Sequence, residues 1–131
     1  MEGVAWSLNG GPNQKSHVQH VLAGKDFRRA VNLFNSATFF EAHEVWEDIW
    51  REVSGPEKKF LQGLIQIAVA LHHHATGNLA GARSLLERGY RNLNGCPDDF
   101  GGINLASLRQ SLAGWQRALA EGTPVPPLPR L

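Results

Sequence analysis

The residues best suited to chemistry lie close together in the stretch FFEAHEVWEDIWRE, residues 39–52. It contains one histidine, five acidic residues and two tryptophans. His43 and Glu47 are four residues apart, so on a helix they share one stripe, with Phe39 one turn before and Trp50 one turn beyond. Imidazole and carboxylate groups at this spacing can bind a metal or transfer protons. The stretch therefore predicts a polar cluster with several alternative roles.

The polar stripe has a counterpart in the apolar segment that follows. Gln62, Gln66 and His73 are spaced by four and seven residues, so they share one face of an otherwise apolar helix. If the chain turns back at Gly55, the two helices run antiparallel and their polar residues come level with each other. The predicted binding or polar cluster contains seven residues: His43, Glu47, Trp50, Arg51, Gln62, Gln66 and His73.

Three roles are open for this cluster. It can be a buried hydrogen-bonded network that fixes the register of the hairpin, with Glu47 accepting from Gln62 or Arg51 and His43 paired with Gln66. It can instead contact a ligand or partner outside the chain. The third role is a metal-dependent, hydrolase-like enzyme with a divalent metal as cofactor, whose candidates are His43, Glu47 and His73 as metal ligands and Glu41 and Glu44 as general bases.

The metal alternative has a geometric difficulty. The sequence HEVWE has Glu47 where the zinc-protease helix motif has its second histidine ligand. His73 is expected to lie roughly 9 Å along the helix axis from His43, which leaves two partial ligand sets instead of one complete set. The triple histidine 72–74 cannot chelate a single ion, because successive side chains on a helix point about 100° apart.

The composition argues against several classes of protein. The 13 Lys and Arg residues nearly balance 12 Asp and Glu residues, so no basic field for nucleic acid is expected. The strongest apolar run, LIQIAVAL, is far shorter than the ~20 residues that span a bilayer, so no membrane partner is expected either.

Cys96 is the only cysteine, which fits a reducing, cytoplasmic location. Asp98 and Asp99 beside it would raise the pKa of the thiol and disfavour a nucleophilic role.

Helical periodicity predicts an all-α protein, and no strand pattern competes with it. We expect a single compact domain, residues 23–121, of about five helices around a central antiparallel hairpin. An N-terminal arm, residues 1–22, is expected to be extended, and the proline-rich tail 122–131 to lie on the surface as an extended strap. The predicted helices are residues 25–34, 37–53, 56–76, 79–93 and 104–120.

The segments FNSATFFEAHEVWEDIWR, FLQGLIQIAVALHHHATGN and GARSLL resemble the small bacterial and archaeal proteins grouped as domain of unknown function 309. The resemblance covers about residues 25–120 and implies a compact all-helical domain without an established reaction. Partners therefore stay unknown, and a homodimer is expected if Trp6, Trp46 or Trp50 forms a surface patch. The family pattern falls on Glu41, His43, Glu44, Glu47, Trp50, Arg51, Gln62, Gln66, His73, Gly77 and Asn78.

Overall fold

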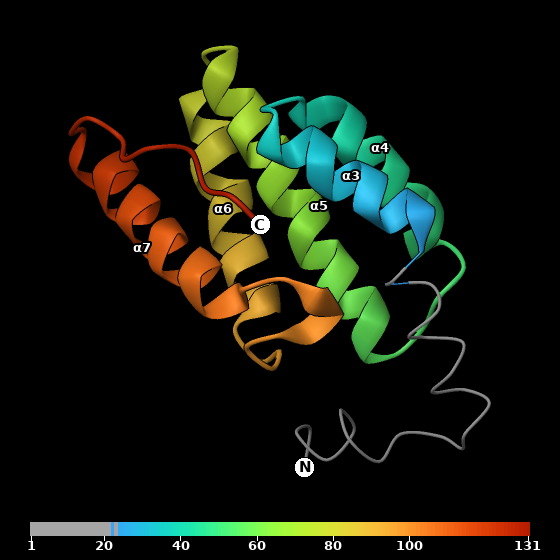
Figure 1. Ribbon diagram of the computed structural model, residues 1–131. Coiled ribbons are helices and arrows are strands. Elements are labelled where there is room, and N and C mark those ends of the chain that lie inside the picture. The colour runs from blue at the N-terminus through green and yellow to red at the C-terminus, as the bar shows by residue number, and fades with distance from the viewer. Residues whose placement is uncertain (1–21, 23) are drawn as a thin grey trace.

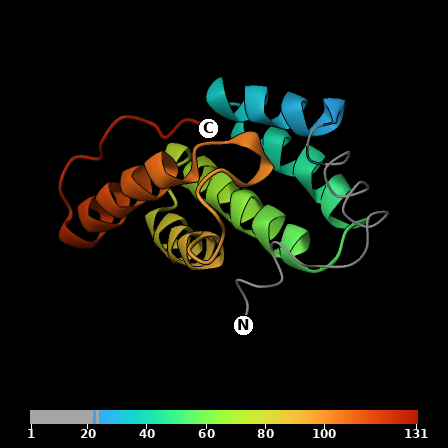
Figure 2. The same cartoon turned by 60° about the horizontal axis from the view of Figure 1, so that its bottom comes forward.

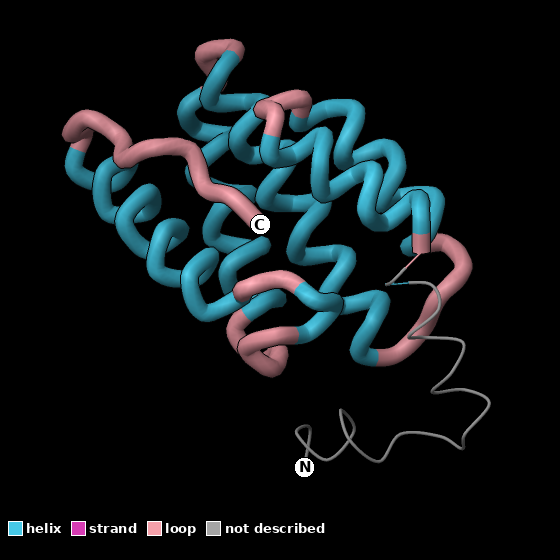
Figure 3. Tube along the Cα trace, in the orientation of Figure 1, coloured by secondary structure: helices cyan, strands magenta, loops and turns pink. Residues whose placement is uncertain are grey.

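The computed structural model describes residue 22 and residues 24–131, so the predicted N-terminal arm lies outside the described residues except for Leu22. In this part of the chain the structure has five α-helices and no strand, which confirms the all-α prediction (Figures 1 and 3). The helices are α3 (Lys25–Asn35), α4 (Phe39–Trp50), α5 (Pro56–Ala75), α6 (Leu79–Leu93) and α7 (Leu105–Glu121), with a short 3₁₀ helix at Phe100–Gly102.

Helix α5 is the centre of the fold, as its nearly all-round apolar sequence predicts. Helices α4 and α6 pack along it, α3 packs on α4, and α7 packs on α6 (Figures 1 and 2). The core side chains of α5 are almost inaccessible to solvent, and each contributes about 1.5–3 kcal/mol of hydrophobic stabilisation. They include Phe60, Leu61, Leu64, Ile67 and Leu71. No described helix is long and apolar enough to cross a membrane.

Backbone conformation sets the ends of the hairpin helices. Helix α4 is shorter than the predicted range 37–53, because Ala37 adopts a φ of 62° and Thr38 becomes the residue before the first turn. Gly77, with a φ of 91°, ends α5 as expected. The side chain of Asn78 accepts a hydrogen bond from the first turn of α6 and caps that helix.

Two glycines allow α5 and α6 to approach each other closely. A Cβ atom at Gly89 would lie 2.6 Å from Cδ1 of Ile67 and 3.0 Å from the carbonyl oxygen of Gly63. A Cβ atom at Gly63 would lie 2.8 Å from the side chain of Leu93. The crossing therefore leaves no room for a side chain at either glycine.

Arg109 of α7 holds the loop that follows α6. Its side chain is only 15% exposed and donates hydrogen bonds to the carbonyl oxygens of Leu93 and Cys96. It also pairs with the carboxylate of Asp98 at 2.7 Å. The Leu93 carbonyl also accepts from the backbone N–H of Cys96, so the guanidinium adds a charged donor at the end of α6 and in the loop that follows it.

Candidate functional site

The border between α4 and α5 carries most of the predicted cluster. At one end, Nζ of Lys58 lies 4.1 Å from the ring centroid of Trp50. At the other end, the rings of Phe40 and His72 are 5.1 Å apart. Both contacts agree with the antiparallel register predicted by counting outward from Gly55.

The seven cluster residues border solvent and do not form a buried network. Arg51 is exposed, and the other six side chains are only partly buried. A hydrogen bond at such a border competes with water, so it contributes less to stability than a bond in the core. The partly buried residues are His43, Glu47, Trp50, Gln62, Gln66 and His73.

The predicted pairing of His43 with Gln66 is wrong. Nδ1 of His43 instead contacts the carbonyl oxygen of Phe40, one turn earlier on the same helix. The Gln66 side chain faces α6, where its Oε1 accepts a hydrogen bond of 2.7 Å from Asn92. Gln66 therefore joins α5 to α6, whereas His43 lies on α4 and bonds within its own helix.

Glu47 has one of its two predicted partners. Its Oε1 lies 3.6 Å from the guanidinium of Arg51, while Gln62 makes no hydrogen bond to a described residue. Arg51 has a closer partner in Asp48, at 2.7 Å. These side chains are largely exposed, so the pairs contribute about 0–1 kcal/mol each.

The three consecutive histidines diverge, as their helical spacing predicts. His72 packs against Phe40 of α4, and His74 packs against Trp115 of α7 with ring centroids 4.9 Å apart. His73 lies between them and has the ring of His72 at 6.2 Å. One run of histidines thus contributes to two different borders of α5.

The candidate metal ligands His43, Glu47 and His73 do not form a ligand set. Across residues 22 and 24–131, no group of three or more His, Cys, Asp or Glu side chains is placed to hold a metal ion. The candidate bases Glu41 and Glu44 are exposed on α4. The described donors therefore do not fit a divalent metal.

Residues 27–85 match the sequence profile of the family described as Domain of unknown function (DUF309). The match confirms the predicted resemblance to this family over these residues, which we call the DUF309 segment. The DUF309 segment contains α4, α5 and most of α3, and it includes all seven residues of the predicted cluster. The match is shorter than the range of about 25–120 expected from the sequence motifs, and the second half of α6 and all of α7 lie outside it.

Two curated relatives are similar to the chain. An uncharacterized protein of Aquifex aeolicus (strain VF5) is 32% identical over 102 residues, which are 74% of this chain and 31% of that protein. Uncharacterized protein YpuF of Bacillus subtilis (strain 168) is 43% identical over 62 residues, covering 47% of this chain and 36% of YpuF. The chain thus spans about a third of the length of these relatives. Their names give no reaction.

Within the DUF309 segment, the aromatic residue beside the histidine differs from the expected one. Phe39 is buried against Phe34, whereas Phe40 is 48% exposed and lies 4.6 Å from the ring of His43. Phe40 therefore has an imidazole on each side, His43 from α4 and His72 from α5. Two adjacent phenylalanines point in directions about 100° apart, so only the helix orientation decides which one is exposed.

Trp46 and Trp50, the two described tryptophans of the homodimer prediction, do not form a surface patch. Trp46 is fully buried and Trp50 is partly buried, while Trp6 lies outside the described residues. The indole N–H groups of Trp46 and Trp50 have no hydrogen-bond partner among the described residues. A homodimer stays a prediction.

Glu57, in the first turn of α5, is a buried acid that the sequence pattern does not single out. It is only 3% exposed, and burial raises the pKa of its carboxyl group, although its own backbone N–H lowers it. The position directly after Pro56 is typical of an exposed helix-start acid. The sequence predicts the turn at Gly55, but it does not reveal that the Glu57 side chain after this turn is buried.

Cys96 lies buried in the loop after α6. Burial raises the pKa of its thiol to about 11, while the positive charges of Arg109 and Lys59 lower it. The predicted direction of the shift is confirmed, but its main cause is burial and not the neighbouring carboxylates. A thiol of this kind is a poor nucleophile at neutral pH.

The raised pKa of Cys96 predicts a pH-dependent stability. Above pH 9 the unfolded thiol ionises, whereas the folded thiol keeps its proton until about 11, so stability falls as pH rises through this range. We expect urea unfolding of the wild type to lose about 1 kcal/mol more between pH 8 and pH 10 than the variant Cys96→Ala. Equal losses in the two proteins would contradict the prediction.

Proposed function

We propose that the DUF309 segment is a protein-binding module whose binding face is the exposed side of α4. The observation that supports this proposal most directly is Phe40, a large apolar side chain that is 48% exposed. It packs on the imidazoles of His43 and His72, so it is held in one orientation at the surface. Exposed aromatic side chains with fixed orientation are typical anchors of protein interfaces.

The charge around Phe40 indicates the chemistry of the partner. Residues 39–52 contain five acidic residues and one arginine, although the whole chain has a net charge of +1. Arg51 neutralises part of this charge through Glu47 and Asp48. Glu41 and Glu44 are exposed and form no ion pair with a described residue. The face is therefore acidic, and a partner with lysine or arginine side chains complements it.

A basic helix or loop with one apolar side chain fits these features. The apolar side chain would cover Phe40, and its cationic neighbours would pair with the free carboxylates of α4. The metal-dependent enzyme has no comparable support, since the described residues contain no three-ligand group.

A photocrosslinking experiment tests this function. In cells that naturally make the protein, the full chain carries p-benzoylphenylalanine either at position 40 or at the exposed position Arg117 of α7. We expect a crosslinked protein at position 40 only, and mass spectrometry of the adduct should place the crosslink in a segment rich in lysine and arginine. The double variant Glu44→Lys/Asp48→Lys should reduce the adduct by about tenfold, because it cancels the net negative charge of residues 39–52.

Salt and stability provide the controls. In lysates brought to 1 M salt before irradiation, the screening length falls to about 3 Å, so no adduct should form. Glu44 and Asp48 are exposed, so the double variant should melt close to the wild-type temperature. Equal crosslinking at positions 40 and 117, or an adduct in a segment without basic residues, would refute the proposed function.

A further inference from the structure

The proline-rich tail lies along a surface between α7 and α3. After Gly122, which has a φ of 71°, the chain leaves α7 and runs across the molecule toward α3 (Figure 1). Nε1 of Trp115 donates a hydrogen bond of 3.0 Å to the carbonyl oxygen of Pro127. At the end of the tail, Leu131 N donates to Oδ1 of Asn35 at 2.8 Å, and Nδ2 of Asn35 donates to the Leu131 carbonyl at 3.3 Å.

These contacts recognise an extended backbone more than a particular side chain. Trp115 and Asn35 bind main-chain groups, and only Arg130 contributes a polar side-chain contact, to the carbonyl oxygen of Asn35. The side chain of Leu128, by contrast, is 49% exposed. An aromatic N–H that donates to a carbonyl of an extended proline-rich segment is a general way to bind such segments, because polyproline II leaves its carbonyls unpaired.

The composition of the tail suits this surface. Pro124, Pro126, Pro127 and Pro129 restrict the backbone before it docks, so little conformational entropy is lost on binding. Pro129 is buried. The ring of Pro126 lies over Gly114 of α7, 3.4 Å from the position that a Cβ atom would take. Gly114 therefore provides space that a proline ring fills.

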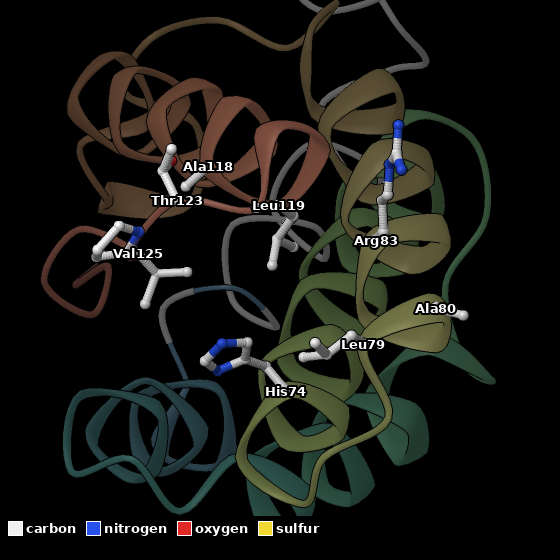
Figure 4. Close-up of a pocket in the computed structure, with 10 residues that line it drawn as sticks. His74, Leu79, Ala80, Arg83, Ala118, Leu119, Thr123 and Val125 are labelled. Carbon is white, nitrogen blue, oxygen red and sulfur yellow. The ribbon is translucent and has the colours of Figure 1, made fainter.

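An open pocket continues the surface at the start of the tail. It has a volume of about 370 Å³ and lies between the end of α5, the start of α6, the end of α7 and residues 122–125. His74, Leu79, Leu119 and Val125 point into it (Figure 4). The pocket therefore offers space beside residues 122–125 that the side chains of the tail do not fill.

From these contacts we propose that the surface between α3 and α7 is a binding site for an extended proline-rich segment of a partner protein, and that residues 123–131 occupy it in cis. The site is independent of the acidic face of α4. Because the tail is tethered at Gly122, its effective concentration at the site is on the order of millimolar. A partner segment therefore binds strongly only when the tail is displaced, and the tail acts as a built-in competitor.

The test uses the full chain with its tail released by one substitution. Pro129→Asp places a charge in the buried part of the tail, whereas the matched control Leu128→Asp places the same charge at an exposed position. The probe is the peptide TPVPPLPRL with fluorescein at its N-terminus, and fluorescence polarisation measures binding. We expect Pro129→Asp to bind the probe at least about tenfold more tightly than the wild type or Leu128→Asp, since the competitor is lost.

Two further measurements show which contacts bind the probe. Adding Trp115→Phe to the released chain removes the donor to the proline carbonyl and should weaken binding by about fivefold or more. The peptide TAVAALARL, in which alanine replaces each proline, should bind more weakly than the probe. If Pro129→Asp fails to fold, the double variant Pro126→Gly/Pro127→Gly replaces it, because it loosens the tail by raising its backbone entropy and removing the Pro126 ring from Gly114.

The outcomes are decisive in both directions. A folded, released chain that binds the probe no better than Leu128→Asp would overturn the proposal, and the tail would be a structural strap only. Mixing Trp115→Phe chains with Pro129→Asp chains tests exchange between copies. A dimer in this mixture, measured by light scattering, would assign the surface to the tail of a second copy and would also overturn the partner proposal.

Discussion

Replacing Gly89 with alanine is expected to lower the free energy of unfolding by about 2 kcal/mol, although alanine is the better helix former by about 1 kcal/mol. The added methyl group would lie 3.0 Å from the carbonyl oxygen of Gly63, a backbone atom that cannot move alone. It would also meet the side chain of Ile67 at 2.6 Å. Helices α5 and α6 must therefore separate, and the packing of the central helix loosens.

Gly114→Ala is the matched control for this variant, because Gly114 is also inside a helix. A Cβ atom there would contact only the ring of Pro126, at 3.4 Å. We expect Gly114→Ala to be neutral or slightly stabilising in thermal unfolding, whereas Gly89→Ala should lower the melting temperature by about 8 °C. If both variants melt alike, the close crossing of α5 and α6 is not a determinant of stability.

The helices could be predicted because their signals are local. Gly77 and Asn78 mark the boundary between α5 and α6, and the structure places that boundary there. Residues 79–93 form α6 as predicted from their apolar spacing. The start of α4 was predicted two residues too early, because the positive φ of Ala37 is unusual for alanine and has no sequence signal.

The sequence predicts which residues of the candidate site lie at the same level along the hairpin, but it does not predict which side chains contact each other. Counting from Gly55 gives the levels of the hairpin correctly, since helical rise is constant. It does not give the rotation of each helix, which decides whether a border residue faces α4 or α6. Gln66 therefore pairs with Asn92 and not with His43, and Phe40 takes the position expected for Phe39. Such rotations depend on the packing of the whole core.

Arg109→Met is expected to lower the free energy of unfolding by about 3 kcal/mol in urea titrations. Methionine keeps the apolar length of the side chain but removes the donors to the carbonyl oxygens of Leu93 and Cys96. The Leu93 carbonyl keeps a second donor in the backbone N–H of Cys96, so the loss falls mainly on the carbonyl group of the buried Cys96. The loop between α6 and α7 should loosen first, and hydrogen exchange at its amides should rise in the variant.

Asp98→Asn separates the ion pair from the carbonyl contacts. The carboxylate of Asp98 is 77% exposed, so its pair with Arg109 contributes about 0–1 kcal/mol, and an asparagine side chain still offers an oxygen to the guanidinium. We expect Asp98→Asn to unfold within about 0.5 kcal/mol of the wild type. A loss as large as that of Arg109→Met would mean that Arg109 stabilises the loop mainly through charge. A small loss would assign its effect to its hydrogen bonds with the carbonyl groups of Leu93 and Cys96.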